Sequence, residues 1–123
     1  MRMRGRRSFR ESFQNAAAGF RYCLATQRNM KVHLAAAVLV LLLSVGIGLS
    51  RLEFALVFFA IGLVLVAEML NTAVEKTVDI YVDTYHPGAR LAKHIAAGAV
   101  LVAAANAAVT GLLVFLPHFR VLW

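Results

Sequence analysis

Three long apolar stretches constrain the fold of this chain more than any other feature of its sequence. The first covers residues 33–49, the second begins near residue 54, and the third covers about 89–116. The first contains no Asp, Glu, Lys or Arg, and its 17 residues would form a helix of about 25 Å, close to the thickness of a bilayer core. The chain is 61% hydrophobic and 15% charged, whereas a soluble domain averages about half and a quarter. We therefore predict an all-α membrane protein, a single domain over residues 1–123.

The second stretch changes character along its length. Residues 54–67 are fully apolar, and a helical pattern with polar side chains then continues to the Pro87–Gly88 stop. A helix over 54–83 would be about 45 Å long, which exceeds the hydrocarbon core. Its later turns should therefore project into the headgroup region or line a cavity.

The segment before the first span has the pattern of an amphipathic helix over residues 8–27. Its apolar side chains recur at helical spacing on one stripe: Phe9, Phe13, Ala16, Phe20 and Leu24. Such a helix lies in a membrane interface or packs against the bundle, and the two arrangements are compatible. We expect a surface helix followed by three transmembrane helices.

The positive charge of the chain, +7, indicates membrane orientation rather than nucleic-acid binding. Eight Lys or Arg residues lie between residues 2 and 31, and Lys76, Arg90 and Lys93 flank the connection between the second and third spans. The positive-inside rule then places the N-terminus and that connection in the cytoplasm. Zinc-ligand spacing, aromatic stacking motifs and a basic recognition helix are absent from the sequence, so no nucleic-acid partner is expected.

The most informative polar residues are Glu68, Asn71, Glu75 and Asp79. At about 100° per residue they fall within one stripe narrower than a third of the helix circumference. Stacked carboxylates repel each other and are unfavourable near lipid, so a divalent cation, protons or basic residues must compensate them. The basic candidates are the following: Arg28, Lys31, Arg90 and Lys93. Because Glu68 directly follows the apolar run, a function is favoured, and metal-assisted phosphoryl transfer, ion conduction and proton relay all stay open.

Several motifs together resemble the prokaryotic diacylglycerol kinase and undecaprenol kinase family. They are Glu68-Met-Leu-Asn71-Thr-Ala-Val-Glu75-Lys-Thr-Val-Asp79, Tyr85-His86-Pro87, Ala92-Lys93 and residues 96–101, with a weaker match over 15–33. The resemblance implies a homotrimer in the bacterial inner or plasma membrane that uses Mg²⁺ and transfers the γ-phosphate of ATP to a lipid alcohol. The His-Pro turn and residues 96–101 look more like the undecaprenol kinase branch than the diacylglycerol kinase branch.

The resemblance also implies roles for individual residues. Glu68 matches the catalytic base, and Glu75 matches a glutamate that holds the metal with ATP. Asn71 and Asp79 match the polar stripe that supports the site or the lipid substrate. The implied nucleotide contacts, besides Glu75, are Asn15, Tyr85, His86, Lys93 and His94.

Two positions depart from the family pattern. Gln27 stands where the family usually has a glutamate that is the second metal ligand, and His94 follows Lys93 where the family usually has an aspartate. Gln27 can still offer a carbonyl oxygen to a hard cation, but with one negative charge fewer. The alternative function is therefore a non-catalytic or altered-specificity relative with a structural or regulatory role.

Overall fold

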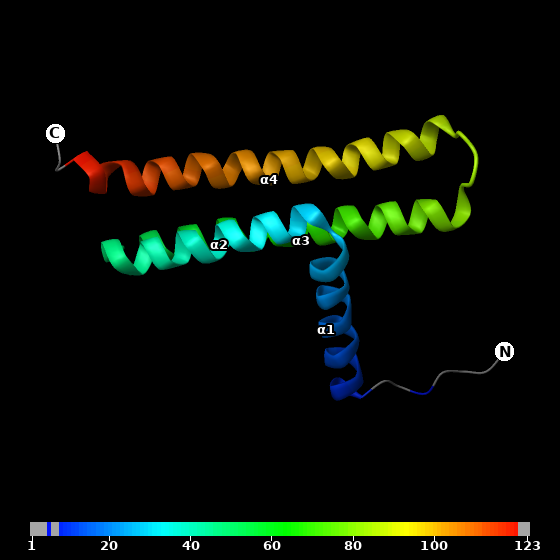
Figure 1. Ribbon diagram of the computed structural model, residues 1–123, viewed down its shortest axis with the longest axis horizontal. Coiled ribbons are helices and arrows are strands. Elements are labelled where there is room, and N and C mark those ends of the chain that lie inside the picture. The colour runs from blue at the N-terminus through cyan, green and yellow to red at the C-terminus, as the bar shows by residue number, and fades with distance from the viewer. Residues whose placement is uncertain (1–4, 6–7, 121–123) are drawn as a thin grey trace.

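The computed structural model describes residue 5 and residues 8–120, and all its regular elements are helices. They are α1 (Phe9–Thr26), α2 (Arg28–Ile47), α3 (Arg51–Tyr81) and α4 (Pro87–Phe119). α2, α3 and α4 run alongside one another, whereas α1 points away from the side of the bundle (Figure 1). The arginines at positions 2, 4, 6 and 7, which contribute to the orientation prediction, lie outside the described residues.

Specific caps define where the long helices begin and end. α2 ends at Gly48, whose φ of 78° is the left-handed conformation that glycine adopts without strain. α3 begins with a capping box in which Ser50 and Glu53 each bond the backbone N–H of the other. α4 begins at Pro87, whose fixed φ suits the first position of a helix.

All three long helices exceed the predicted spans, and α3 runs over Arg51–Tyr81 where a helix over 54–83 was predicted. α2 begins at Arg28 rather than at residue 33, because hydropathy detects the apolar run and not the polar first turn. α4 continues through Pro117 to Phe119, past the predicted end at residue 116. Pro117 removes one backbone N–H donor from the last turn of α4, and only two helical residues follow it.

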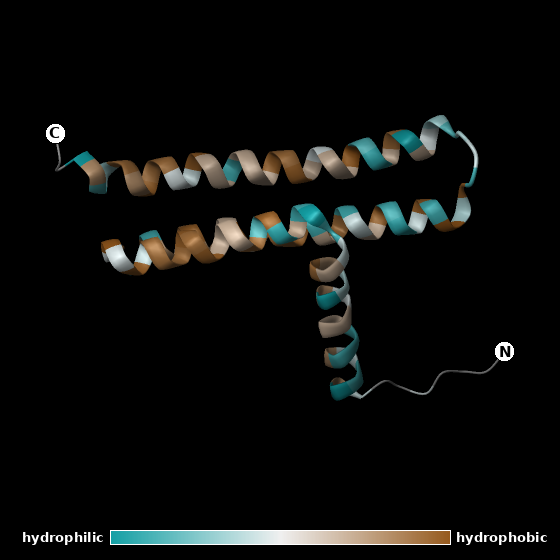
Figure 2. Cartoon of the chain, in the orientation of Figure 1, coloured by the Kyte–Doolittle hydropathy of each residue, from teal (hydrophilic) through white to brown (hydrophobic). Residues whose placement is uncertain are grey.

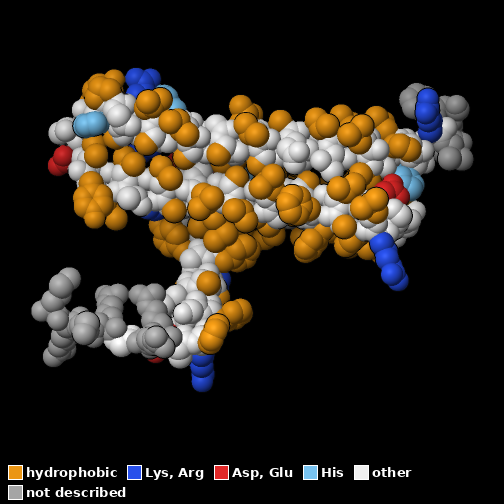
Figure 3. All heavy atoms as spheres, turned by 180° about the vertical axis from the view of Figure 1, so that it is seen from behind, with side chains coloured by type: hydrophobic (Ala, Val, Ile, Leu, Met, Phe, Trp, Pro, Cys, Tyr) orange, Lys and Arg blue, Asp and Glu red, His pale blue; other side chains and the backbone are white. Residues whose placement is uncertain are grey.

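The helices pack along narrow seams. α2 buries Met30, Ala37 and Ser44, which recur every seven residues. α3 buries a line of residues spaced mostly by three or four positions: Val57, Ala60, Val64, Glu68, Asn71 and Thr72. The largest shared contact is between α3 and α4. Because only one stripe of each helix is buried, the remaining apolar side chains face outward over much of the surface (Figure 3).

The predicted membrane protein with three long apolar helices is confirmed. α2, α3 and α4 are each long and apolar enough to cross a membrane. Figure 2 shows that hydrophilic residues concentrate in the halves of α3 and α4 nearest their connecting loop, and that α1 meets the bundle between its two ends, where α2 begins. The amphipathic role of α1 and the trimer stay predictions.

Candidate active site at the polar end of the bundle

Glu68 is the most deeply buried charged residue of the described chain. It is 2% exposed and lies on the packing seam of α3, immediately after the apolar half of that helix. Its Oε2 atom has no hydrogen-bond partner among the described residues. A buried carboxylate without a partner is unfavourable, so its retention here indicates a functional use rather than a contribution to stability.

His33 of α2 faces this carboxylate. Its Nε2 atom lies 3.9 Å from Glu68 Oε2, which is within ion-pair range but too long for a hydrogen bond. Sequence reasoning did not select His33, which it treated only as the start of the first span. A signal was present, because His33 lies three residues after buried Met30 and four before buried Ala37, on the same helical stripe.

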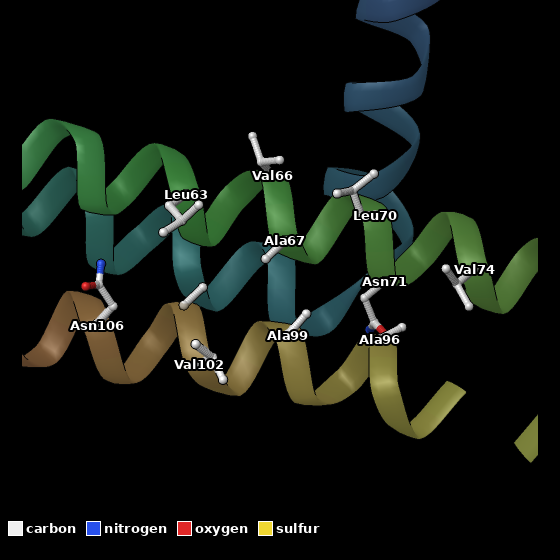
Figure 4. A pocket seen from close by; sticks show the side chains of 11 residues that line it. Leu63, Val66, Ala67, Leu70, Asn71, Val74, Ala96, Ala99, Val102 and Asn106 are labelled. Carbon is white, nitrogen blue, oxygen red and sulfur yellow. The ribbon is translucent and has the colours of Figure 1, made fainter. Parts of the chain in front are cut away.

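Asn71, one turn along α3, turns toward α4. It is 8% exposed, and its Oδ1 atom also lacks a hydrogen-bond partner in the described part of the chain. It lies at a groove of about 590 Å³ between α3 and α4, which is otherwise lined almost entirely by Ala, Val and Leu, with Asn106 at the far end (Figure 4). Two polar groups, Glu68 Oε2 and Asn71 Oδ1, are therefore unsatisfied within about one helical turn.

Exposure increases along the predicted carboxylate stripe. Glu68 is buried, Glu75 is half-buried, and the Asp79 side chain is 59% exposed. Asp79 Oδ1 accepts from Lys93 Nζ at 2.5 Å, which joins α3 to α4 near their connecting loop. Of the basic residues predicted to compensate the stripe, Lys93 is the one that pairs with it in the described structure.

The connection between α3 and α4 lies at the polar end of the bundle, here called its open end, and carries further predicted site residues. His86 caps α4, since its Nδ1 accepts the backbone N–H of Ala89 at 3.1 Å, and its proton must therefore be on Nε2. Tyr85 is 75% exposed, and His94 is exposed on the second turn of α4. His86 therefore has a structural role that leaves Nε2 free, while Tyr85 and His94 are open to a ligand.

The two predicted site residues near α1 lie apart from this turn in the fold. Asn15 is exposed on α1, and Gln27 is the half-buried residue that ends α1 and precedes α2. The C-terminal part of α1 meets α3 where Lys76 Nζ lies 5.6 Å above the Tyr22 ring. Gln27 therefore lies beside the bundle, where α1 meets α2, whereas most of α1, including Asn15, does not contact the bundle of its own protomer.

A divalent cation bound together with ATP fits the residues present. Within the described residues, no group of three His, Cys, Asp or Glu side chains forms a closed metal site. Magnesium commonly takes only one or two protein carboxylates together with substrate phosphates. Glu75 makes no hydrogen bond or ion pair within the described part of the chain, and the Gln27 amide nitrogen donates to Thr26 at 3.1 Å, which leaves the Gln27 oxygen available.

A second groove, of about 560 Å³, runs between α2, α3 and α4. His33 lies among its lining residues, with Phe115 and Phe119 of the last turns of α4. The other lining residues are almost all Ala, Val, Leu and Ile. An apolar channel along the helices therefore borders the residue that faces Glu68.

These features define a class of protein: a helical membrane protein with an acidic centre where its apolar core meets its polar end. The sequence comparisons identify the family. The prokaryotic diacylglycerol kinase profile matches residues 14–115, so the chain belongs to the prokaryotic diacylglycerol kinase family, as the motifs predicted. The chain is thus a lipid kinase, a transferase.

Two curated relatives cover most of this chain. It is 44% identical to an undecaprenol kinase of Bacillus subtilis over 109 residues, 89% of each chain. It is 41% identical to a diacylglycerol kinase of a Synechocystis species over 107 residues, which is 86% of this chain and 61% of the relative. Both comparisons favour the lipid kinase prediction over the non-catalytic alternative.

Proposed function

We propose that this protein transfers the γ-phosphate of ATP to the hydroxyl group of a membrane lipid alcohol at the cytoplasmic face of a bacterial membrane, and that undecaprenol is its substrate. The observation that carries the proposal is the unpartnered carboxylate of Glu68, buried at the level where the apolar half of α3 ends. A lipid hydroxyl group reaches this level while its hydrocarbon chain stays among apolar side chains.

Glu68 is the proposed general base. Its carboxylate takes the proton of the lipid hydroxyl as the oxygen attacks the γ-phosphorus, and the bond from that phosphorus to the β–γ bridging oxygen breaks, with ADP as the leaving group. Asn71, one turn away with a free Oδ1, supports the reacting groups.

The nucleotide is proposed to lie at the open end of the bundle. Lys93, Tyr85, His86 Nε2 and His94 present polar groups there, and Lys93 is held by Asp79. Glu75 and the Gln27 oxygen would hold Mg²⁺. When bound, this ion supplies charge neutralisation for the phosphates. Asn15 of α1 is proposed as a further nucleotide contact.

Undecaprenol is preferred over diacylglycerol for two reasons. The relative named undecaprenol kinase aligns over 89% of its own length, and the relative named diacylglycerol kinase over 61%. The groove between α2, α3 and α4 is lined by apolar side chains and borders His33, so a prenyl chain could lie along it with its hydroxyl group toward Glu68.

The decisive experiment is phosphate transfer from radiolabelled ATP by purified protein in micelles. Undecaprenol and diacylglycerol are offered separately, with a known kinase of the family assayed in parallel. Label in undecaprenol supports the full proposal, and label in diacylglycerol alone supports the kinase but rejects the substrate. Absence of label in both lipids, with the reference kinase active, rejects the proposed function.

A further inference from the structure

We infer that His33 positions the catalytic carboxylate, by donating a hydrogen bond from its Nε2–H to Oε2 of Glu68 in the reacting complex. The inference deepens the proposed function and rests on Glu68 being the base. It starts from one contact: these two atoms face each other at 3.9 Å across the seam between α2 and α3.

The fold aims the two side chains at each other. Glu68 belongs to the buried line of α3, and His33 shares a stripe of α2 with Met30 and Ala37, which are 0% and 6% exposed. The side chain of Glu68 is 3% exposed and that of His33 is 25% exposed. The carboxylate is therefore enclosed, while the imidazole connects it to the more open groove between the helices.

Other charged groups on the neighbouring elements are occupied or distant. Along α3, Glu75 and Lys76 follow Glu68 by seven and eight residues, a rise of about 10 to 12 Å, and Lys76 lies over Tyr22 of α1. On α4, Lys93 pairs with Asp79. In the described part of the chain, His33 is the only basic side chain within ion-pair distance of Glu68.

A carboxylate that accepts a proton in a buried site needs a fixed orientation. Without a donor, Oε1 and Oε2 can rotate away from the lipid hydroxyl, and a misplacement of about 1 Å can cost on the order of 10²-fold in rate. Catalytic hydrogen bonds are often long without substrate and tighten in the reacting complex. A separation of 3.9 Å can close to hydrogen-bond length by a change of side-chain rotamer on either residue.

The activity test compares His33→Phe with His33→Gln. Phe keeps a ring but has no donor, whereas Gln carries an amide N–H at a similar reach. We expect His33→Phe to lower kcat by roughly 10- to 100-fold, less than the roughly 10²- to 10⁴-fold expected for loss of a general base. The KM values for ATP and lipid should stay within about twofold, and His33→Gln should recover most of kcat.

Val32→Phe is the matched control, because it adds a ring to the neighbouring, 58% exposed position of the same helix and should leave kcat unchanged. Circular dichroism and elution in detergent check that each variant folds. A His33→Phe enzyme with normal kcat, a change in KM alone, or a His33→Gln enzyme as slow as His33→Phe would each overturn the inference.

A spectroscopic test does not depend on kinase activity. The chain has four histidines, and ¹⁵N labelling of their rings gives signals that His33→Gln assigns. We expect Glu68→Gln to shift the Nε2 signal of His33 and not that of His118, whereas Glu53→Gln should shift only His118, whose Nε2 lies 2.7 Å from Glu53 Oε2. An unmoved His33 signal in Glu68→Gln contradicts the inference.

The two proposals can fail separately. If the wild-type chain transfers no phosphate, the proposed function fails, and the histidine signals still decide whether His33 engages Glu68. If the wild-type chain is active and His33→Phe is equally active, only the positioning inference fails.

Discussion

At the residue scale, Glu68 lies where the apolar half of α3 meets its polar half, and its carboxylate is almost completely enclosed. We predict that Glu68→Gln keeps the fold and lowers kcat by roughly 10²- to 10⁴-fold, because Gln preserves the volume but cannot take the proton. The control is Asp83→Asn, which neutralises an exposed carboxylate beyond the end of α3. Steady-state assays with undecaprenol measure both, and an active Glu68→Gln enzyme would mean that another group is the base.

Gln27 is the proposed metal ligand that carries an amide where the family usually has a carboxylate. An amide oxygen is a weaker ligand for a hard cation than a carboxylate. We predict that Gln27→Glu lowers the Mg²⁺ concentration needed for half-maximal activity, whereas Gln14→Glu, an equivalent charge change on the exposed face of α1, does not. Magnesium titrations of the two variants measure this difference, and equal requirements would remove Gln27 from the metal site.

At the element scale, α3 and α4 are joined at both ends. Lys93 and Asp79 form one pair, and at the other end His118 contacts Glu53, which also completes the capping box of α3. This second pair exists because α4 continues as a helix through Pro117. The two pairs lie at opposite ends of the contact between α3 and α4, and in the register that forms both of them Asn71 lies at the groove between these helices.

The double role of Glu53 leads to a prediction about stability. Glu53→Gln should retain the capping interaction, since Gln also serves in a capping box, but should lose the charge that faces His118. Glu53→Ala loses both interactions. We expect the midpoint of thermal unfolding in detergent to fall in the order wild type, Glu53→Gln, Glu53→Ala, and identical midpoints for the two variants would show that the cap contributes nothing.

α1 presents an apolar stripe that the bundle leaves uncovered. Phe9 is 96% exposed and Phe13 is 76% exposed, although α1 is held to α3 near Tyr22. Aromatic side chains on an amphipathic helix are stabilised when they enter the membrane interface. We therefore expect α1 to lie on the bilayer surface with this stripe toward the lipid.

A tryptophan placed on each face tests this arrangement. With Trp123 replaced by Phe, brominated lipids should quench Phe13→Trp strongly and Gln14→Trp weakly, because the two positions point in different directions around α1. Fluorescence in vesicles measures the difference. Equal quenching at the two positions would contradict a surface helix with a defined lipid face.

At the scale of the whole molecule, one protomer does not enclose its own site. The groove at Asn71 is open, Asn106 is exposed within the apolar part of α4, and most of α1 is unpacked. An exposed amide among apolar side chains favours a contact with another helix in a membrane. We predict a homotrimer, so light scattering in mild detergent should give a protein mass three times the 13.4 kDa of the chain. A monomer that retains full activity would contradict this prediction.

Much of this molecule could be predicted from local patterns alone. Lengths of apolar sequence indicated three spanning helices, and the spacing of Glu68, Asn71, Glu75 and Asp79 placed them on one stripe, because helical periodicity depends only on position along the chain. The motifs around Glu68 indicated the family. These inferences needed no knowledge of how one helix lies against another.

Tertiary structure alone decided how residues from different helices meet. Three side-chain pairs between helices cannot be read from the sequence, since each depends on the rotation and register of two packed helices. They are His33 with Glu68, Lys93 with Asp79, and His118 with Glu53. Burial is also a tertiary property: the stripe on α3 passes from enclosed Glu68 to exposed Asp79 because α2 packs beside Glu68, whereas at Asp79 the neighbour is α4 through Lys93. Periodicity determines the face that a side chain occupies, and packing determines what that face meets.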